Sequence, residues 1–404
     1  MKIASLVNLS VLLVSLFLCA LVLEVASRIL FEAPPSVVVE NLSDPSAEVG
    51  AVKESKKVTL RDGQIYSSGV PDSGFYIHTP TGRRLRPGVS GAITGHHLAR
   101  KDIAFSTNSL GYRDEEIGEK GDRDYRILVL GDSITLGDFV EADQTYPAQI
   151  ERHLNGDGPL AVDGRNVQVI NTGVGAIDLQ NELAILLETG VTVEPDIVLV
   201  GLYLNDAYHS QVLKITRLSP ALSWSHFVRV ASMWLDVFRD RYVYEGSRLR
   251  DEGAIEAERE RFLATYPVAE GDWKTSREAF NAKIADKIGD WGYAWSADFW
   301  QKIVPILELM KQVGNERGFR VAVMLLPVRE QVQSELLVDE PQQEFERHMG
   351  ELGLAHIDLL PLLREKYEQD GVNVFYDHCH YRPEGYEYFS KFVAEFLMNE
   401  VISR

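Results

Sequence analysis

Short apolar runs alternate with longer amphipathic stretches from about residue 124 to the end of the chain. The first run, residues 126–130, is rich in β-branched residues and is followed by Gly131, which is typical of a buried parallel strand. The runs predict five strands, at residues 126–130, 167–172, 196–204, 319–326 and 354–359. Because strands that alternate with helices form a sheet covered on both faces, the pattern predicts a parallel α/β fold.

The stretches between the runs carry apolar residues at helical spacing. Residues 178–189 place leucines on one face of a predicted helix. A second helix begins at Pro341 and ends at Gly353, since proline favours the first turn and glycine the position after the last. A third begins near Glu384 and buries an aromatic face. These helices supply the layers on the two faces of the predicted sheet.

The longest apolar run lies at the amino terminus, where residues 3–23 contain no charge. At about 1.5 Å rise per residue, a helix of this length spans about 30 Å, the thickness of a bilayer core. We predict a transmembrane anchor over residues 1–30, with the rest of the chain outside the cytoplasm, because Lys2 and the α-amine precede the run. A cleaved signal peptide and a buried core helix are the alternatives. The apolar run is long for the hydrophobic region of a signal peptide, and it lacks the polar face of a core helix.

The rest of the chain divides into three predicted segments. Residues 31–123 form a juxtamembrane linker to about residue 55 and then an irregular extension, in which short β-like pieces alternate with Gly and Pro turns. The extension ends in the segment 107–114 and a charged stretch. Residues 124–404 form the main domain, which a predicted helical insertion at 207–298 interrupts. We expect this insertion to form a cap beside the site, because the chain leaves the sheet there at its catalytic edge.

Aromatic residues are concentrated in and just after the insertion, since all six tryptophans fall between Trp224 and Trp300. One amphipathic helix is predicted from the apolar residues that recur at helical spacing: Trp224, Phe227, Val230, Ala231, Trp234, Leu235 and Phe238. Its apolar face has three possible roles: packing on the domain, an aromatic wall for substrate, or a surface that faces the membrane.

Charge and cysteine content narrow the classes of function. The net charge of −19 argues against nucleic acid and against anionic lipid headgroups as partners, since both require a basic surface. The chain has two cysteines, Cys19 in the apolar run and Cys379 in a motif described below. We expect no disulfide between them, because it would tie that motif to the membrane segment.

Four separate motifs together indicate nucleophilic catalysis by serine. Ser133 follows the first predicted strand within Gly131-Asp132-Ser133, at the sheet edge where α/β proteins bind ligands. A serine hydroxyl needs an adjacent base. We predict that His380 is this base and that Asp377, three residues earlier, orients its imidazole through Nδ1. The predicted catalytic residues are therefore Ser133, Asp377 and His380.

Two alternative interpretations of the Asp377–His380 motif remain open. His378 could compete as the base, although we expect its side chain to point away from Asp377. The four residues from Asp377 to His380 could also bind a metal, but their spacing is too tight for all four to converge. We predict no metal and no cofactor.

Two further motifs supply donors for an oxyanion. Asn205 follows the third predicted strand, and its side-chain amide can donate to a developing negative charge. Asp206 is interpreted as a cap. The turn at residues 171–176 offers backbone N–H groups at the end of the second strand. The backbone N–H of Ser133 completes the predicted set.

Taken together, these motifs make the chain resemble the SGNH hydrolases, also called the GDSL esterase/lipase family. The resemblance covers about residues 124–404. Gly131-Asp132-Ser133 matches the first block, Asn205-Asp206 the third, and Asp377-x-x-His380 the fifth. The sequence departs from the family pattern at Ala176, which occupies the position of the oxyanion glycine. It also departs at Tyr203, which replaces a glycine and is expected to narrow the pocket. A backbone N–H survives at Ala176 unless that position needs a positive φ.

The resemblance implies a three-layer α/β/α, flavodoxin-like fold and a metal-independent esterase or acyltransferase. The layout also resembles a membrane-anchored bacterial subgroup that often accompanies envelope polysaccharide synthesis. The expected function is hydrolysis of acyl esters, with acetyl favoured, on an envelope or exported polysaccharide in the periplasm or outside the cell. A polysaccharide O-acetyltransferase with the same triad and a non-catalytic polysaccharide-binding factor are the alternatives.

Overall fold

The computed structural model describes residues 2–31, 37–41, 57–71, 74–79, 81–156, 164–207, 213–217, 225–231 and 252–402. The chain divides into two units. One consists of Met1–Leu42 with Lys214–Ser247, and the other of Ser43–Leu213 with Arg248–Arg404. All the residues of the predicted site belong to the second unit.

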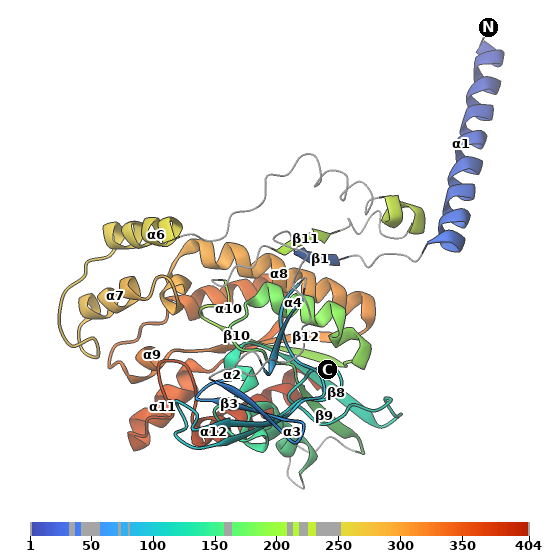
Figure 1. Cartoon of the computed structure of the whole chain (residues 1–404). Coiled ribbons are helices and arrows are strands. Elements are labelled where there is room, and N and C mark those ends of the chain that lie inside the picture. The colour runs from blue at the N-terminus through green and yellow to red at the C-terminus, as the bar shows by residue number, and fades with distance from the viewer. Residues whose placement is uncertain are drawn as a thin grey trace. The chain divides into compact units, whose positions relative to one another are not determined.

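A five-stranded parallel sheet forms the centre of the second unit (Figure 1). Its strands are β8 (Asp124–Leu130), β9 (Asn166–Asn171), β10 (Ile197–Tyr203), β12 (Arg320–Leu326) and β13 (Ala355–Asp358). All five were predicted and are confirmed, and every neighbouring pair is parallel. The order β13-β12-β10-β8-β9 puts the first strand between the second and the third. In such sheets ligands bind where the order reverses, between β8 and β10.

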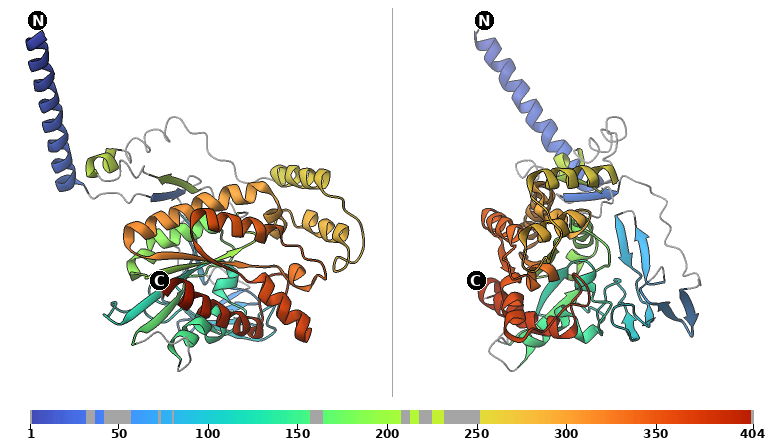
Figure 2. Two further views of the ribbon diagram at one scale, coloured as in Figure 1. Left: turned by 180° about the vertical axis from the view of Figure 1, so that it is seen from behind. Right: turned by 90° about the vertical axis from the view of Figure 1, so that its left-hand side faces the viewer.

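Helices cover both faces of this sheet, with α4, α8 and α10 on one side and α3 and α12 on the other (Figure 2). The strands β8 and β10 are buried almost throughout, as expected for a sheet covered on both faces. The three predicted helices are confirmed as α4, α10 and α12. The larger helices are α3 (Tyr146–Asn155), α4 (Leu179–Glu188), α8 (Ala297–Arg317), α10 (Glu340–Leu352), α11 (Leu360–Asp370) and α12 (Pro383–Phe396). Shorter helical pieces are α2 (Ser133–Leu136), α9 (Arg329–Gln333), the 3₁₀ turns Ala142–Gln144 and Gly190–Val193, and a terminal π turn Leu397–Ile402.

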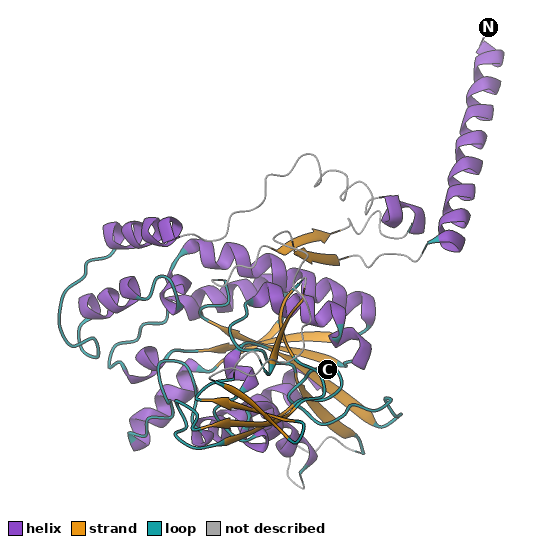
Figure 3. Ribbon diagram, viewed as in Figure 1, coloured by secondary structure: helices purple, strands orange, loops and turns teal. Residues whose placement is uncertain are grey.

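The extension before the sheet is more regular than predicted (Figure 3). A four-stranded sheet has the order β2 (Val58–Arg61), β3 (Gln64–Ser68), β6 (Ser90–Thr94), β7 (Ile103–Ser106). A separate antiparallel hairpin joins β4 (Tyr76–Thr79) and β5 (Gly82–Leu85). Each strand has only four or five residues, which is too short for an alternating pattern to stand out in the sequence.

The first unit contains helix α1 (Lys2–Leu30) and a two-stranded sheet of β1 (Val37–Asn41) and β11 (Leu213–Arg217). Residues Val11–Leu30 of α1 are long and apolar enough to cross a membrane, with a mean hydropathy of 2.2. Among the described residues no other helix meets this criterion. A signal sequence near an amino terminus passes the same test. Near the end of α1, the Glu24 carboxylate accepts hydrogen bonds from Ser225 Oγ and from the N–H groups of His226 and Phe227. These donors begin a helical turn at residues 226–231.

The described part of the predicted insertion is shared between the two units. Strand β11 and the turn at 226–231 belong to the first unit, apart from Leu213 at the division. Helices α6 (Glu252–Thr265) and α7 (Arg277–Asp286) and the 3₁₀ turn Trp291–Trp295 belong to the second. Trp224, Trp234, Leu235 and Phe238 of the predicted amphipathic helix lie outside the described residues. The predicted segment borders at 30, 123, 207 and 298 stay predictions.

Candidate active site

Ser133 is positioned by the turn that connects strand β8 to helix α2. It is the first residue of α2, and the Asp132 carboxylate caps the helix by accepting from the Ile134 N–H at 2.8 Å. Gly131 cannot carry a side chain, because a Cβ there would lie 1.9 Å from the Thr135 hydroxyl. The helix has a single turn, since Gly137 ends it in a left-handed conformation with a φ of 62°. Ser133 therefore lies on a single helical turn.

The structure brings the three predicted catalytic side chains into one chain of hydrogen bonds. Ser133 Oγ lies 2.9 Å from His380 Nε2, and His380 Nδ1 lies 2.7 Å from Asp377 Oδ2. The other carboxylate oxygen of Asp377 accepts from the N–H groups of Cys379 and His380 at 2.9 and 2.8 Å. Asp377 therefore holds both the backbone of this turn and the imidazole. The arrangement is that of a serine–histidine–carboxylate triad.

The electrostatics of the pair suit a base that carries a proton during reaction. Burial opposes the charged form of His380, but the hydrogen bond and the charge of Asp377 outweigh it and raise the pKa of His380. Burial likewise opposes the charge of Asp377, yet the hydrogen bond and charge of His380 and the two backbone donors hold the pKa of Asp377 well below its usual range. Asp377 thus stays ionised and stabilises the imidazolium.

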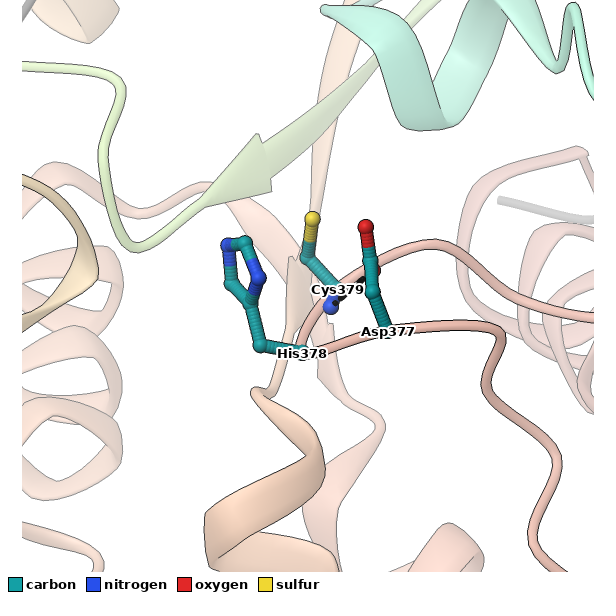
Figure 4. Close-up of side chains that lie close together, drawn as sticks. All are labelled: Asp377, His378 and Cys379. Atoms are coloured by element: carbon teal, nitrogen blue, oxygen red, sulfur yellow. Dashed lines mark hydrogen bonds between the residues drawn. The ribbon is translucent and has the colours of Figure 1, made fainter. Parts of the chain in front are cut away.

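His378 forms an ion pair with a residue outside the motif. Its Nε2 lies 3.4 Å from Asp290 Oδ2, in the turn that follows helix α7. Figure 4 shows its ring and the Asp377 carboxylate on opposite sides of Cys379, although a ring nitrogen and a carboxylate oxygen of the two residues lie within 4.8 Å of each other. The hydrogen bond between Ser133 and His380 favours His380 over His378 as the base.

The motif also brings together three groups that resemble a metal site. Asp377, His378 and Cys379 place ligand atoms within 4.8 Å of one another (Figure 4). The carboxylate oxygens of Asp377 already accept from His380 and from two N–H groups, which argues against this use. Burial raises the pKa of the Cys379 thiol well above its usual range.

The turn after strand β9 lies directly against the nucleophile turn. The Asn171 amide donates to the Thr135 carbonyl at 2.9 Å, and its oxygen accepts from the Gly173 N–H at 3.0 Å. A Cβ at Gly173 would lie 2.2 Å from the Leu136 nitrogen, so the two turns touch backbone to backbone. Ala176 has a φ of 57°, in the region that favours glycine. The position therefore does require a positive φ, and this chain meets the requirement with an alanine.

Asn205 follows strand β10, on the other side of β8 from the turn at Ala176. Its Nδ2 donates to Asp290 Oδ1 at 3.3 Å, and its Oδ1 is buried without a hydrogen-bond partner among the described residues. One hydrogen of the amide remains for another acceptor. Sequence reasoning missed Asp290, whose carboxylate contacts both Asn205 and His378, because it lies 85 residues from Asn205 in the chain.

Two expectations about the neighbours of Asn205 need correction. Among the described residues Asp206 caps no helix; its carboxylate accepts from the Tyr203 N–H at 2.6 Å and closes the turn after β10. Tyr203 does not narrow the site, because its side chain is completely buried. The glycine-to-tyrosine departure therefore changes the core beneath the site.

Residues of the extension support both turns. Arg113 is buried and donates to the carbonyls of Leu136, Gly137 and Val140, which surround the end of the nucleophile helix. The carboxylate of Asp114 accepts from the Asn171 N–H at 2.8 Å. Both residues belong to the segment 107–114 that the sequence singled out, although nothing in it pointed to these contacts.

Buried carboxyl groups gather beneath the same edge of the sheet. Burial raises the pKa of Asp132 to about 6 and that of Asp178 to about 7, and raises the pKa of Glu182 and Asp206 well above the usual range. Neither carboxylate oxygen of Glu182 has a hydrogen-bond partner among the described residues. Sequence reasoning missed this cluster because its members come from different elements.

Comparison with protein-family models gives no match, and comparison with curated protein sequences gives none either. Among solved structures, similarity is found to a two-domain esterase active on acetylated mannans, with 12% identity and a TM-score of 0.37 over 70% of this chain. The chain spans about half the length of that esterase, since 50% of it is covered. A catalytic mutant of Axe2, an acetylxylan esterase from Geobacillus stearothermophilus, has 13% identity and a TM-score of 0.37, over 71% of this chain and 100% of that one. The acetyl xylan esterase AlAXEase has 12% identity and a TM-score of 0.36, over 69% of this chain and 100% of that one. Values this low carry no argument about this chain.

Proposed function

We propose that this chain is a membrane-anchored serine esterase of the SGNH type that works through an acyl-serine intermediate. The observation that carries the proposal is the continuous chain of hydrogen bonds from Ser133 through His380 to Asp377, at 2.9 and 2.7 Å. Its members come from the turn after β8 and from a turn 247 residues later in the chain. The order of the strands puts Ser133 at the edge where such sheets bind ligands.

The reaction follows from the roles of these groups. Ser133 Oγ attacks the ester carbonyl carbon while His380 Nε2 takes the hydroxyl proton, and Asp377 stabilises the imidazolium. The N–H groups of Ser133 and Ala176 and the free amide hydrogen of Asn205 hold the oxyanion. The tetrahedral intermediate collapses, and His380 gives its proton to the departing alcohol. The neutral His380 then takes a proton from water as the water oxygen attacks the acyl carbon. The bond from that carbon to Ser133 Oγ breaks, His380 returns the proton to Ser133 Oγ, and the acid is released. The sequence of steps requires neither a metal nor a cofactor.

A series of nitrophenyl esters of increasing acyl length tests the esterase proposal on the full chain in detergent. We expect turnover of the acetyl ester, and we expect Ser133→Ala to abolish it without a change in melting temperature. Ser109→Ala, an exposed serine of the extension, is the matched control and should behave like wild type. Wild-type activity in Ser133→Ala would show that the nucleophile is wrongly assigned.

We propose that helix α1 anchors the enzyme in the cell membrane with the second unit outside the cytoplasm. The length and mean hydropathy of Val11–Leu30 support a span, and the charge before the apolar run supports the orientation. A reporter enzyme that is active only outside the cytoplasm, fused after Arg404, should be active. Activity of a cytoplasm-only reporter at the same position would contradict the orientation.

The substrate that we propose is an acetyl ester on an envelope or exported polysaccharide. The resemblance to the membrane-anchored subgroup and the proposed orientation support this class. Acetate release from an acetylated oligosaccharide measures hydrolysis, and transfer of the acetyl group to a second oligosaccharide measures acetyltransferase activity. Dominant transfer would replace the esterase by the acyltransferase, with the same triad.

A further inference from the structure

The peptide bond that precedes Ala176 is held by two side chains of the extension. Arg83 Nη1 donates to the Gly175 carbonyl at 3.1 Å, although 92 residues separate them. The Tyr76 hydroxyl lies against the same glycine, since a Cβ at position 175 would lie 2.8 Å from it. The Gly175 backbone is therefore fixed by groups from outside the predicted hydrolase domain.

The hairpin of β4 and β5 makes Arg83 and Tyr76 act together. His78 is the register partner of Arg83, and Tyr76 lies two residues before it, so Tyr76 and Arg83 are diagonal neighbours on one face. The Arg83 guanidinium lies over the Tyr76 ring at 3.5 Å from the centroid. Tyr76 itself is buried. Stacking thus restrains the guanidinium in the direction of the Gly175 carbonyl.

The geometry of a peptide bond links this contact to the proposed oxyanion site. The Gly175 carbonyl and the Ala176 N–H belong to one planar group, in which they point in opposite directions. The described residues contain no cis peptide bond. A cationic donor on the carbonyl therefore fixes the direction of the N–H and also polarises it. Ala176 would not favour this orientation on its own, because its φ of 57° suits glycine.

We propose that Arg83, held by Tyr76, is a positioning residue that aims the Ala176 N–H at the oxyanion. This inference rests on the proposed function, since it assigns a support to the oxyanion site of that reaction. Arg83 acts through the peptide group and does not touch the reacting atoms. The amino-terminal extension is thereby a part of the catalytic apparatus.

Arg84, the next residue on β5, provides a matched control. Its guanidinium donates to Glu188 Oε2 at 2.9 Å, near the end of helix α4, and to the Thr81 hydroxyl at 3.0 Å. Arg84→Ala should therefore weaken the hairpin without releasing the Gly175 carbonyl. Arg83→Ala should lower kcat on nitrophenyl acetate by about 10- to 100-fold, since losing an oxyanion donor altogether costs about 100- to 1,000-fold. KM should stay within about twofold, and Arg83→Lys should recover part of kcat.

Two further readouts separate positioning from a general loss of stability. A trifluoromethyl ketone forms an oxyanion with the nucleophilic serine, so its Ki should rise in Arg83→Ala by the same factor as kcat falls. Amide hydrogen exchange of the peptide covering residues 173–178 should become faster in Arg83→Ala and stay unchanged in Arg84→Ala. Melting temperatures of both variants show how much of any effect is loss of stability.

The outcomes decide between the explanations. Unchanged kcat and unchanged exchange in Arg83→Ala would overturn the proposal. Equal losses of kcat in Arg83→Ala and Arg84→Ala, at equal losses of melting temperature, would also overturn it and leave only a structural role for the hairpin. If the wild-type protein hydrolyses no ester, the proposed function fails. The exchange measurement then still decides whether Arg83 holds the Ala176 peptide.

Discussion

Replacing Ala176 by glycine tests whether the oxyanion turn stores backbone strain. Ala176 is exposed and has a φ of 57°, so its methyl group gains little from packing and conflicts with its own backbone. A left-handed conformation costs an L-residue about 1–2 kcal/mol. Glycine removes this cost and keeps the backbone N–H that we assign to the oxyanion.

The expected size follows from two opposing terms. Glycine loses more backbone entropy on folding than alanine, which offsets about 0.5–1 kcal/mol of the gain. The net expectation is that Ala176→Gly raises the free energy of unfolding by about 0.5–1 kcal/mol. For a unit of this size, that is a rise in melting temperature of about 1–3 °C.

Thermal unfolding and ester turnover measure the two consequences. Glu194→Gly is the matched control, because Glu194 is also exposed, has a φ of 52° and lies outside the site. Both variants should gain stability, and both should keep kcat within about threefold of wild type. A lower melting temperature in Ala176→Gly, with a higher one in Glu194→Gly, would refute the assignment of strain. Stability gained together with a tenfold loss of kcat would show that the methyl group, rather than the hairpin, holds the turn.

Three further changes test the electrostatics of the site. Asp377 raises the pKa of His380, and the neutral imidazole is the base, so kcat/KM should fall as the pH drops through that pKa. Asp377→Asn should move this acidic limb of the pH profile to lower pH. It should also reduce kcat by about 10,000-fold. An acidic limb that stays in place would contradict this role. Because the pKa of Glu182 is raised in the folded state, the folded protein keeps a proton on Glu182 that the unfolded chain releases, so stability is lost as the pH rises above the pKa of Glu182 in the unfolded chain. Glu182→Gln should therefore raise the melting temperature more at pH 8 than at pH 5. An equal rise at both pH values would contradict a raised pKa of Glu182. His378→Ala should lower kcat by less than about tenfold, since His378 contacts Asp290 and its ring lies on the other side of Cys379 from the Asp377 carboxylate. A larger loss than in His380→Ala would show that His378 is the base.

The sheet and the hydrogen-bonded arrangement of Ser133, His380 and Asp377 could be predicted because their signals are local. A fully buried parallel strand is an uninterrupted apolar run, and β8, β10 and β12 each show one. The serine follows such a run, and Asp377 and His380 lie three residues apart on one turn. The parallel strands then bring the pieces to the same edge of the sheet, so the order of motifs was enough to place them together.

The remaining features depend on contacts or conformations that no local pattern encodes. Asp290 and Asn205 are 85 residues apart, and the carboxyl cluster joins residues from three connections of the sheet. The φ of Ala176 is set by the neighbouring turns, so the sequence showed only that a family glycine was missing. The extension was expected to hold short β-like pieces, but strands of four or five residues do not show from the sequence which of them pair.

The sequence border at residue 124 is therefore not a physical border of the site. Arg113 satisfies three carbonyls around the nucleophile helix from one side of that border, and Asp114 holds the Asn171 N–H. Each of these buried carbonyls would lose a charged donor if the extension were absent, and unsatisfied buried groups are costly. The Gly175 carbonyl depends on the extension in the same way, through Arg83. The motifs that carry the chemistry belong to the sheet, but the backbone geometry on which an oxyanion site depends is set by the two elements together.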